Sequence, residues 1–271
     1  MAEKIPTVQQ LFDLTGKVAL LTGAARGIGY HIATGFVEVG ATVIITDMDG
    51  AAAKKAAEQL SKDAGGKADS YAMDVTDQEQ VNAAFDFVKE KYGKLDILVN
   101  NAGHAPRAEY YHLWNRELKD WNTVVQTNLN GAFLCSQAAV KLMMEARSGS
   151  IINIASIAAL AGRDRRIYEG LDMRPNIVDY GTAKAGVLGF TYDSAAEMAP
   201  YNIRVNAISP GGVKRDQPTE FIERYCDLTM ARRMAKEETD FKAVAVLLAS
   251  DASAYITGQN IVVDGGFCVF K

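Results

Sequence analysis

The chain of 271 residues has a formal net charge of −4, and 48% of its residues are hydrophobic. This acidic balance argues against electrostatic binding of nucleic acid, and no run of about 18 apolar residues suggests a membrane span. The N-terminal stretch lacks the apolar core of a signal peptide, and the three cysteines are widely separated, so we expect a reduced, cytoplasmic protein without a disulfide framework.

Apolar segments of strand length alternate with longer helical segments along the chain. Segments rich in Val and Ile that are apolar on both faces indicate parallel strands covered on both sides. Strands are predicted over 17–22, 41–46, 70–73, 95–100, 150–155, 203–209 and 259–264, and helices over 28–39, 51–63, 78–92, 121–147, 180–198 and 241–250. This order predicts the α/β class: a single-domain Rossmann fold over 14–271, with a doubly wound seven-stranded parallel sheet and helices on both faces, after an N-terminal extension over 1–13.

Two polar segments interrupt this alternation. Residues 162–178 are charged and stand where a short connection would suffice, and residues 211–232 are of mixed composition. Both follow predicted strands at the carboxyl edge of the sheet, where open α/β folds bind ligands. Because long loops in a domain are commonly functional covers, we expect the first to be an inserted substrate loop and the second a lid, both too polar to form a core.

A glycine-rich turn joins the first predicted strand to the first long helix. Its sequence is Thr22-Gly-Ala-Ala-Arg-Gly-Ile-Gly29. Glycines allow a tight turn and a close approach to a diphosphate, and the helix N-terminus offers free N–H groups and a positive dipole end. A glycine cluster in this strand-to-helix context predicts a dinucleotide site.

The end of the second predicted strand bears on the choice of dinucleotide. Asp47 stands there, 18 residues after Gly29, and Met48 follows it. A carboxylate at this place can accept hydrogen bonds from adenosine ribose hydroxyls and repels a 2′-phosphate. We therefore expect NAD rather than NADP, although Arg26 in the glycine loop is a base that could reach a 2′-phosphate.

Several motifs in chain order resemble those of the short-chain dehydrogenase/reductase family. The TGxxxGxG spacing over 22–29, the Asn-Asn-Ala-Gly segment over 100–103, the YxxxK pattern at Tyr180 and Lys184, and the Pro210-Gly211 turn all fit it. The resemblance covers about 14–267. Together with the glycine loop, it implies cofactor contacts from Gly23, Arg26, Gly27, Ile28, Gly29, Asp47, Met48, Asp74, Val75, Asn101, Ala102, Gly103, Tyr180, Lys184, Pro210, Gly211 and Val213.

The same resemblance implies a catalytic set of Asn128, Ser156, Tyr180 and Lys184. Ser156 and Tyr180 are 24 residues apart, which is wider than the family's usual spacing, and the 162–178 insertion accounts for the difference. Tyr168 lies nearer that spacing, but the residue four positions later is Asp172, which cannot supply a cation. Tyr180 is therefore the predicted acid/base.

A second departure from the family follows the Pro210-Gly211 turn. Arg215 stands where the family frequently has a Thr that contacts the cofactor carboxamide.

The predicted chemistry follows from these side chains. Residues i and i+4 share a helix face, so we expect the Lys184 ammonium to lower the pKa of Tyr180 from its usual value near 10. Ser156 can hydrogen-bond the substrate oxygen. By resemblance alone, Asn128 holds a water that links Lys184 to solvent. No group of residues has metal-ligand spacing, and we predict no catalytic metal.

The substrate stays open at this point. The chain's two ends resemble the gluconate 5-dehydrogenase-like branch of sugar-acid and polyol enzymes, and the basic residues Arg163, Arg165, Arg166, Lys214 and Arg215 could receive a carboxylate. The alternatives are a 3-oxoacyl-carrier-protein reductase-like ketoreductase, an enzyme for steroids or other apolar alcohols, and a catalytically silent dinucleotide-binding scaffold. We expect a small-molecule alcohol or ketone substrate, no nucleic acid or membrane partner, and a homotetramer, because relatives usually pair their long helices.

Overall fold

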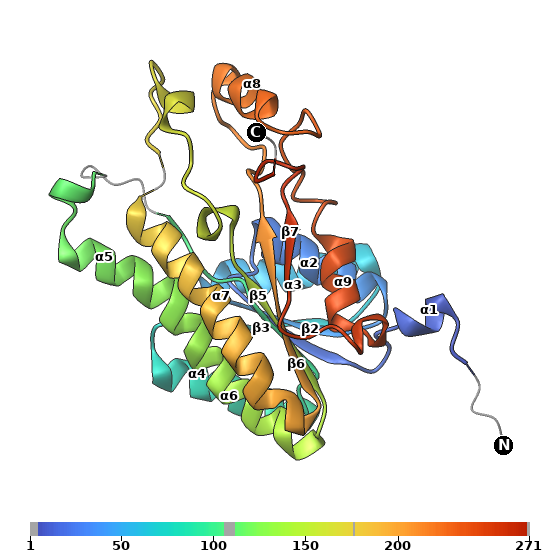
Figure 1. Cartoon of the computed structure of the whole chain (residues 1–271). Helices are drawn as coiled ribbons and strands as arrows, with labels where there is room; N and C mark the ends of the chain where they lie inside the picture. Colours follow the sequence, from blue (N-terminus) through green and yellow to red (C-terminus); the bar gives the residue numbers. More distant parts are fainter. Residues whose placement is uncertain (1–4, 106–111, 176, 270–271) are drawn as a thin grey trace.

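A seven-stranded parallel sheet occupies the centre of the molecule (Figure 1). The computed structural model describes residues 5–105, 112–175 and 177–269. The strand order is β3-β2-β1-β4-β5-β6-β7, which confirms the predicted Rossmann-type fold. The strands are β1 (Val18–Thr22), β2 (Thr42–Asp47), β3 (Ala68–Ala72), β4 (Ile97–Asn100), β5 (Gly149–Ile154), β6 (Ile203–Pro210) and β7 (Asn260–Val263).

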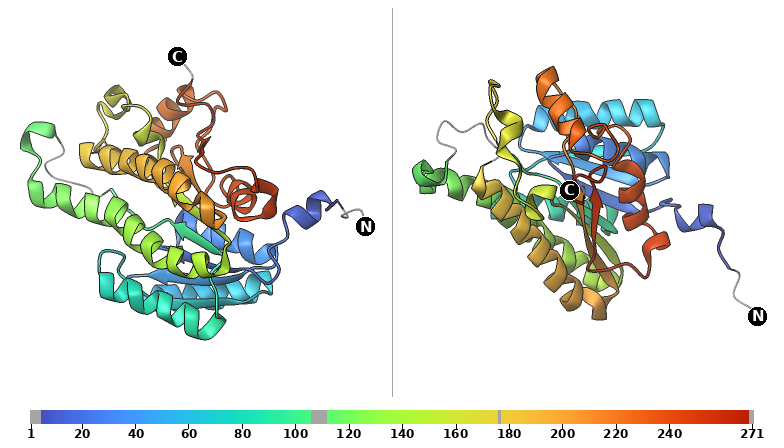
Figure 2. Two further views of the ribbon diagram at one scale, coloured as in Figure 1. Left: turned by 60° about the horizontal axis from the view of Figure 1, so that its bottom comes forward. Right: turned by 45° about the horizontal axis from the view of Figure 1, so that its top comes forward.

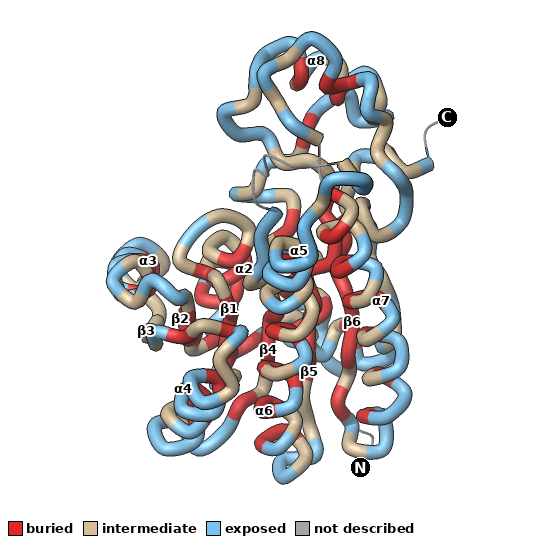
Figure 3. Tube along the Cα trace, turned by 90° about the vertical axis from the view of Figure 1, so that its left-hand side faces the viewer, coloured by how far each residue is buried: buried red, intermediate tan, exposed pale blue. Residues whose placement is uncertain are grey.

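Helices cover both faces of this sheet (Figure 2). On one face, α2 (Gly27–Glu38), α3 (Gly50–Ala64) and α9 (Lys242–Ala249) bury apolar residues against β1 and β2. On the other, α4 (Gln78–Tyr92), α6 (Gly131–Ala146) and α7 (Val178–Met198) form a second core against β4 and β5. The central strands are buried along most of their length (Figure 3), as the prediction of strands apolar on both faces requires.

The order of the strands determines where a ligand can bind. The chain moves outward from β1 through β2 to β3, and then returns to pair β4 with the other side of β1. The connections after β1 and β4 therefore diverge to opposite faces and leave a crevice at the carboxyl ends of the strands. Asp47, Asn101 and Ser156 all lie at or just after such ends.

The predicted helix over 121–147 is interrupted in the structure. It consists of α5 (Leu118–Val125), a π-helical turn over Gln126–Asn130, and α6. Two short helices that the sequence analysis did not predict are α1 (Val8–Leu11) and α8 (Thr219–Asp227). Helix α8 lies within the segment expected to be a lid.

The expectation that 162–178 and 211–232 are too polar to form a core is wrong. Ile167 and Tyr168 of the first segment pack with Phe221 and Tyr225 of α8 and with Met234 in a separate hydrophobic cluster. Phe221 and Tyr225 are four residues apart and share one face of the helix, and the Tyr168 and Phe221 ring centroids are 5.2 Å apart. The two segments rise together above the sheet (Figure 1).

Neither a membrane-spanning helix nor a metal-binding group is found in the described ranges. No helix there combines the length and the apolar character needed to cross a membrane. No set of three or more His, Cys, Asp or Glu side chains in those ranges is arranged to hold a metal ion.

Candidate active site

One large cavity opens at the carboxyl ends of the strands and has a volume of about 1620 Å³. It extends from the glycine loop and the end of β2 to the start of α7, and the 162–178 and 211–232 segments cover one side. Among the residues predicted from sequence, those that line it are Gly23, Arg26, Gly27, Ile28, Asp47, Met48, Asp74, Val75, Asn101, Ala102, Gly103, Ser156, Tyr180, Lys184, Pro210, Gly211 and Val213. The structure therefore brings almost the whole predicted set to one cavity.

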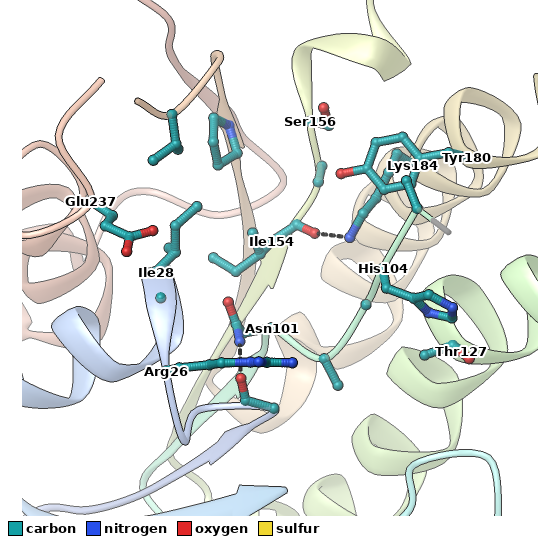
Figure 4. A pocket seen from close by; sticks show the side chains of 18 of the residues that line it. Arg26, Ile28, Asn101, His104, Thr127, Ile154, Ser156, Tyr180, Lys184 and Glu237 are labelled. Atoms are coloured by element: carbon teal, nitrogen blue, oxygen red, sulfur yellow. Dashed lines mark hydrogen bonds between the residues drawn. The ribbon is translucent and has the colours of Figure 1, made fainter. Parts of the chain in front are cut away.

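Hydrogen bonds connect the glycine loop to the segment after β4. The Thr22 hydroxyl accepts hydrogen bonds from the amides of Asn101 and Ala102, both at 3.0 Å. The Asn101 side chain donates to the carbonyls of Thr22 (2.9 Å) and Gly23 (2.8 Å) (Figure 4). A Cβ on Gly29 would collide with the Asn101 amide. Gly29, which does not line the cavity, is thus required for this packing, and Asn101 holds the loop in shape.

The start of α2 fits the diphosphate of a dinucleotide. Gly23 and Gly27 have φ of +57° and +64°, a conformation that other residues rarely adopt. Arg26 occupies the N-cap position, and its side chain makes no cap hydrogen bond to the first N–H groups of the helix. Because Gly27 and Ile28 line the cavity, the donors and the glycine cradle suit a phosphate group.

The end of β2 lines one end of the cavity. Asp47 is half-buried, and its Oδ1 accepts a hydrogen bond from the Asp49 amide at 3.2 Å. Met48 is 77% exposed and brings no charge. Asp74 also lines this end, but its Oδ1 accepts from the Thr76 amide and hydroxyl at 2.9 and 2.8 Å. Asp47 and Asp74 thus both bring a carboxylate to this end of the cavity, and Asp47 stands at the last residue of β2.

The opposite end of the cavity brings Ser156, Tyr180 and Lys184 together (Figure 4). Ser156 follows β5, and the other two share one face of α7. The Lys184 Nζ donates to the Ile154 carbonyl at 2.7 Å and lies 5.8 Å from the Tyr180 ring centroid. The hydrogen bond to the β5 backbone fixes the ammonium group at the base of the site.

Burial dominates the ionisation of these groups. Desolvation lowers the pKa of Lys184 to about 8. Burial also raises the pKa of Tyr180, and the Ser156 hydroxyl and the charges of Arg163 and Arg215 only partly oppose it. The expected net lowering of the Tyr180 pKa is therefore wrong, because burial of the site outweighs the groups that lower this pKa.

Asn128 lies behind this end of the site, in the π-helical turn. Its side chain is buried and donates to the carbonyls of His104 (2.8 Å) and Val124 (3.0 Å). Its Oδ1 has no hydrogen-bond partner among the residues that the structure describes. A Cβ on Gly103 would collide with this Oδ1 and lie 3.3 Å from the Lys184 Nζ. Asn128 thus offers an acceptor on the Lys184 side of the cavity without lining it.

The predicted basic cluster divides into two groups. Arg163 and Arg215 line the cavity. Arg165, Arg166 and Lys214 do not, because they are exposed on the outside of their loops; Arg166 pairs with Asp164 at 2.7 Å. The Arg163 Nη1 donates to the Tyr168 hydroxyl at 2.8 Å. Tyr168, which the sequence analysis rejected as the acid/base, therefore fixes an arginine beside the site.

Other cavity residues gave no sequence motif. Asn122, Thr123, Gln126 and Thr127 line one wall, and the only signal in the sequence is their helical spacing just before Asn128. Further residues that line the cavity come from the two covering segments and their surroundings: Met173, Arg174, Gly212, Gln217, Phe221, Tyr225, Met234 and Glu237.

Comparison with known proteins places this cavity among dinucleotide enzymes. The family described as "Enoyl-(Acyl carrier protein) reductase" matches residues 23–268. The chain is 37% identical to the 3-oxoacyl-(acyl-carrier-protein) reductase FabG of Thermotoga maritima, over 94% of this chain and 99% of that protein. It is 39% identical to the D-threitol dehydrogenase of Mycolicibacterium smegmatis, over 95% of each. The crystal structure of a gluconate 5-dehydrogenase from Burkholderia cenocepacia, in complex with NADP and tartrate, superimposes with a TM-score of 0.86 at 34% identity, over 96% of this chain and 98% of that one.

Proposed function

The chain belongs to the short-chain dehydrogenase/reductase family, and on that premise we propose that it uses NAD(H) to interconvert the alcohol and ketone forms of a small sugar acid or related hydroxy acid. At the coarser level it is an oxidoreductase for hydroxyl or keto substrates that uses a nicotinamide dinucleotide. The observation that carries the finer proposal is the position of Arg163 in the same cavity as Tyr180, where its charge favours the ionised form of the tyrosine.

Tyr180 is the proposed acid/base. When bound, the dinucleotide supplies or accepts the hydride. Tyr180 donates its proton to the ketone oxygen during reduction and takes it back during oxidation. Because burial raises the pKa of Tyr180, the hydroxyl is protonated and ready to donate at neutral pH. Ser156 is the proposed donor that holds the substrate oxygen, and its hydrogen bond favours the tyrosinate form.

Lys184 and Asn128 are the proposed route for the proton. Lys184 is held by the Ile154 carbonyl and its pKa is lowered to about 8, so it can gain and lose a proton near neutral pH. The unpartnered Oδ1 of Asn128 on the same side is a suitable acceptor for a water that connects Lys184 with solvent.

Asp47 supports the choice of NAD. Its carboxylate lies at the β2 end of the cavity, the proposed adenosine end, and would repel a 2′-phosphate, while the exposed Met48 beside it provides no cation. Arg26 also lines the cavity and is the one residue of the glycine loop that favours NADP. The complex of the Burkholderia cenocepacia relative contains NADP, so Asp47, rather than relatedness, supports this part of the proposal.

Arg163 supports an anionic substrate. Arg163 is half-buried, its guanidinium is oriented by the Tyr168 hydroxyl at 2.8 Å, and its charge favours the ionised form of Tyr180. A substrate carboxylate bound there would place a neighbouring carbinol carbon near the acid/base. Planar guanidinium groups pair well with carboxylates, and the partly buried position protects the interaction from solvent.

The proposal is tested by steady-state kinetics with NAD and NADP on matched sugar acids and neutral polyols. Arg163→Gln should raise KM for the acid by about tenfold or more, the loss expected for one charged hydrogen bond, and leave the polyol nearly unchanged. Arg166→Gln is the matched control, because Arg166 lies outside the cavity. Equal losses for acid and polyol would refute the anionic substrate.

Reduction of 3-oxoacyl thioesters is the competing activity, and the 37% identical Thermotoga maritima protein favours it. Part of the cavity is apolar, with Met173, Phe221 and Met234 in its lining, as an acyl chain would require. Turnover of a 3-oxoacyl thioester with a higher kcat/KM than any sugar acid would support this function instead. No turnover with any substrate, despite NAD binding, would support a silent scaffold.

We also propose a homotetramer in which the long helices pair. Helices α6 and α7 lie side by side on one surface (Figure 1), and Phe133 and Tyr192 are 45% and 49% exposed on them. Such apolar groups are typical of interfaces. Light scattering at micromolar concentration should give a multiple of the 29.3 kDa chain mass; the mass of one chain would refute the assembly.

A further inference from the structure

An ion pair lies over the glycine loop and is not part of the proposed catalytic set. The Arg215 guanidinium donates to the Glu237 carboxylate at 3.1 and 2.8 Å, and both residues line the cavity. The Arg215 Nη2 is 3.3 Å, and the Glu237 Oε2 is 3.7 Å, from the position that a Cβ on Gly27 would take. The pair therefore lies against the first residue of α2, beside the N–H groups suited to a phosphate; Figure 4 shows Glu237 near Ile28 of this helix.

The backbone places the two side chains together. Val213 and Ala235 form a parallel bridge, in which the Lys214 amide donates to the Ala235 carbonyl and the Ala235 amide donates to the Gly212 carbonyl, both at 2.9 Å. Arg215 and Glu237 each stand two residues beyond this bridge. The chain bends at Arg215 and turns at Glu237, so the bridge brings the two segments together just before the two side chains meet over the glycine loop.

We propose that Arg215 binds the diphosphate of the dinucleotide and that Glu237 holds the guanidinium in position until the diphosphate replaces it as the partner. This inference rests on the dinucleotide binding of the proposed function, but not on the substrate. Arg215 stands where the family frequently has a Thr that contacts the cofactor carboxamide, but in this chain its guanidinium lies against Gly27 instead, beside the N–H groups suited to the two negative charges of a diphosphate.

The energetics favour such an exchange of partners. The Arg215 side chain is 55% exposed and that of Glu237 is 20% exposed, and solvent-exposed ion pairs contribute little to stability. Breaking the pair is therefore easy. In contrast, a Glu237 carboxylate left beside an entering diphosphate repels it, so Glu237 opposes binding while it orients Arg215. Removing one charge or the other should thus change affinity in opposite directions.

The test is calorimetric titration of the unliganded protein with ADP and, separately, with adenosine, so that no turnover is involved. Arg215→Gln should weaken ADP binding by about tenfold or more, the loss typical of a charged hydrogen bond, and this effect should diminish at high salt. Glu237→Gln should tighten ADP binding severalfold. Adenosine affinity should not change in either variant. Lys214→Gln is the matched control, since Lys214 is exposed and does not line the cavity.

Equal weakening of ADP binding by Arg215→Gln and Glu237→Gln would show that the pair only fastens the loop, and would overturn the inference. Unchanged ADP affinity in Arg215→Gln would overturn it as well. Two failures can be told apart. If the wild type binds neither ADP nor NAD, the proposed function itself is wrong. If the wild type binds both and Arg215→Gln binds them equally well, only the inference about Arg215 is wrong.

Discussion

A buried ion pair next to Tyr180 gives a prediction about stability. Asp179 directly precedes Tyr180 in α7, and its side chain is 0% exposed. Its Oδ2 accepts hydrogen bonds from the Arg116 Nε (2.8 Å) and Nη2 (2.6 Å), and the Arg116 side chain is 4% exposed. Arg116 also pairs with Asp120 at 3.0 Å, whose side chain is 38% exposed. The pair thus joins the start of α5 to the start of α7.

Asp179→Asn removes the charge that compensates the buried Arg116. Losing one partner of a buried pair costs about 3–5 kcal/mol, and for a chain of this size each kcal/mol lowers Tm by about 2–4 °C. We therefore expect a decrease in Tm of about 6–20 °C. Asp120→Asn removes a partly exposed partner of the same arginine and should cost about 0–1 kcal/mol.

Thermal unfolding followed by circular dichroism, at one protein concentration for all variants, measures these differences. The double variant Arg116→Met with Asp179→Asn should recover part of the loss, because the uncompensated charge is gone. A decrease for Asp179→Asn no larger than that for Asp120→Asn would show that the pair is not a buried link, and would refute the reasoning.

Three further predictions concern the site. Tyr180→Phe should abolish turnover while NADH still binds by fluorescence titration, whereas Tyr168→Phe should keep kcat within about tenfold, since the Tyr168 hydroxyl only contacts Arg163; the reverse pattern would make Tyr168 the acid/base. Asp47→Ala with Met48→Arg should shift the kcat/KM ratio toward NADP, and a wild type that already prefers NADP would contradict the role of Asp47. Burial lowers the pKa of Lys184 from 10.5 to about 8. Between these pH values the unfolded chain keeps a proton on this residue that the folded chain has lost, so Lys184 makes the free energy of unfolding of the wild type increase with pH in that range. Lys184→Met should lack that rise in urea unfolding measured from pH 7 to 10, and parallel curves for the two proteins would contradict the shift.

Much of the fold follows from local patterns in the sequence. Strands such as β1 and β2 are apolar on both faces, so their parallel, covered arrangement could be predicted without knowledge of contacts. The glycine loop could also be predicted from sequence, because the backbone conformations at Gly23 and Gly27 strongly favour glycine at these positions. Helix α8 was missed because its polar residues outnumber the two aromatic side chains, Phe221 and Tyr225, that it buries.

What the sequence could not provide are interactions between distant residues. Arg116 and Asp179 are 63 residues apart, and Arg215 and Glu237 are 22 apart, with no local pattern that pairs them. The desolvation that raises the pKa of Tyr180 depends on all the surrounding segments, so spacing alone indicated the wrong net direction. Arg165 and Arg166 are near Arg163 in sequence but lie outside the cavity, because they begin the short 3-10 helix Arg165–Tyr168 on its exposed side, whereas Arg163 precedes that helix.

The π-helical turn at Asn128 has a consequence for chain length. Such a turn behaves as one extra residue inserted into an α-helix, and one residue corresponds to a rotation of about 100°. Val124 of α5 and Cys135 of α6 are both buried, although they lie on either side of this turn. Because the turn already accommodates the extra residue, deleting one residue from 126–130 would give a regular helix in which the apolar faces of α5 and α6 keep their directions. The Asn128 side chain, in contrast, would lose the position that the irregular turn gives it, so the extra residue matters for the site rather than for the packing of the two helices.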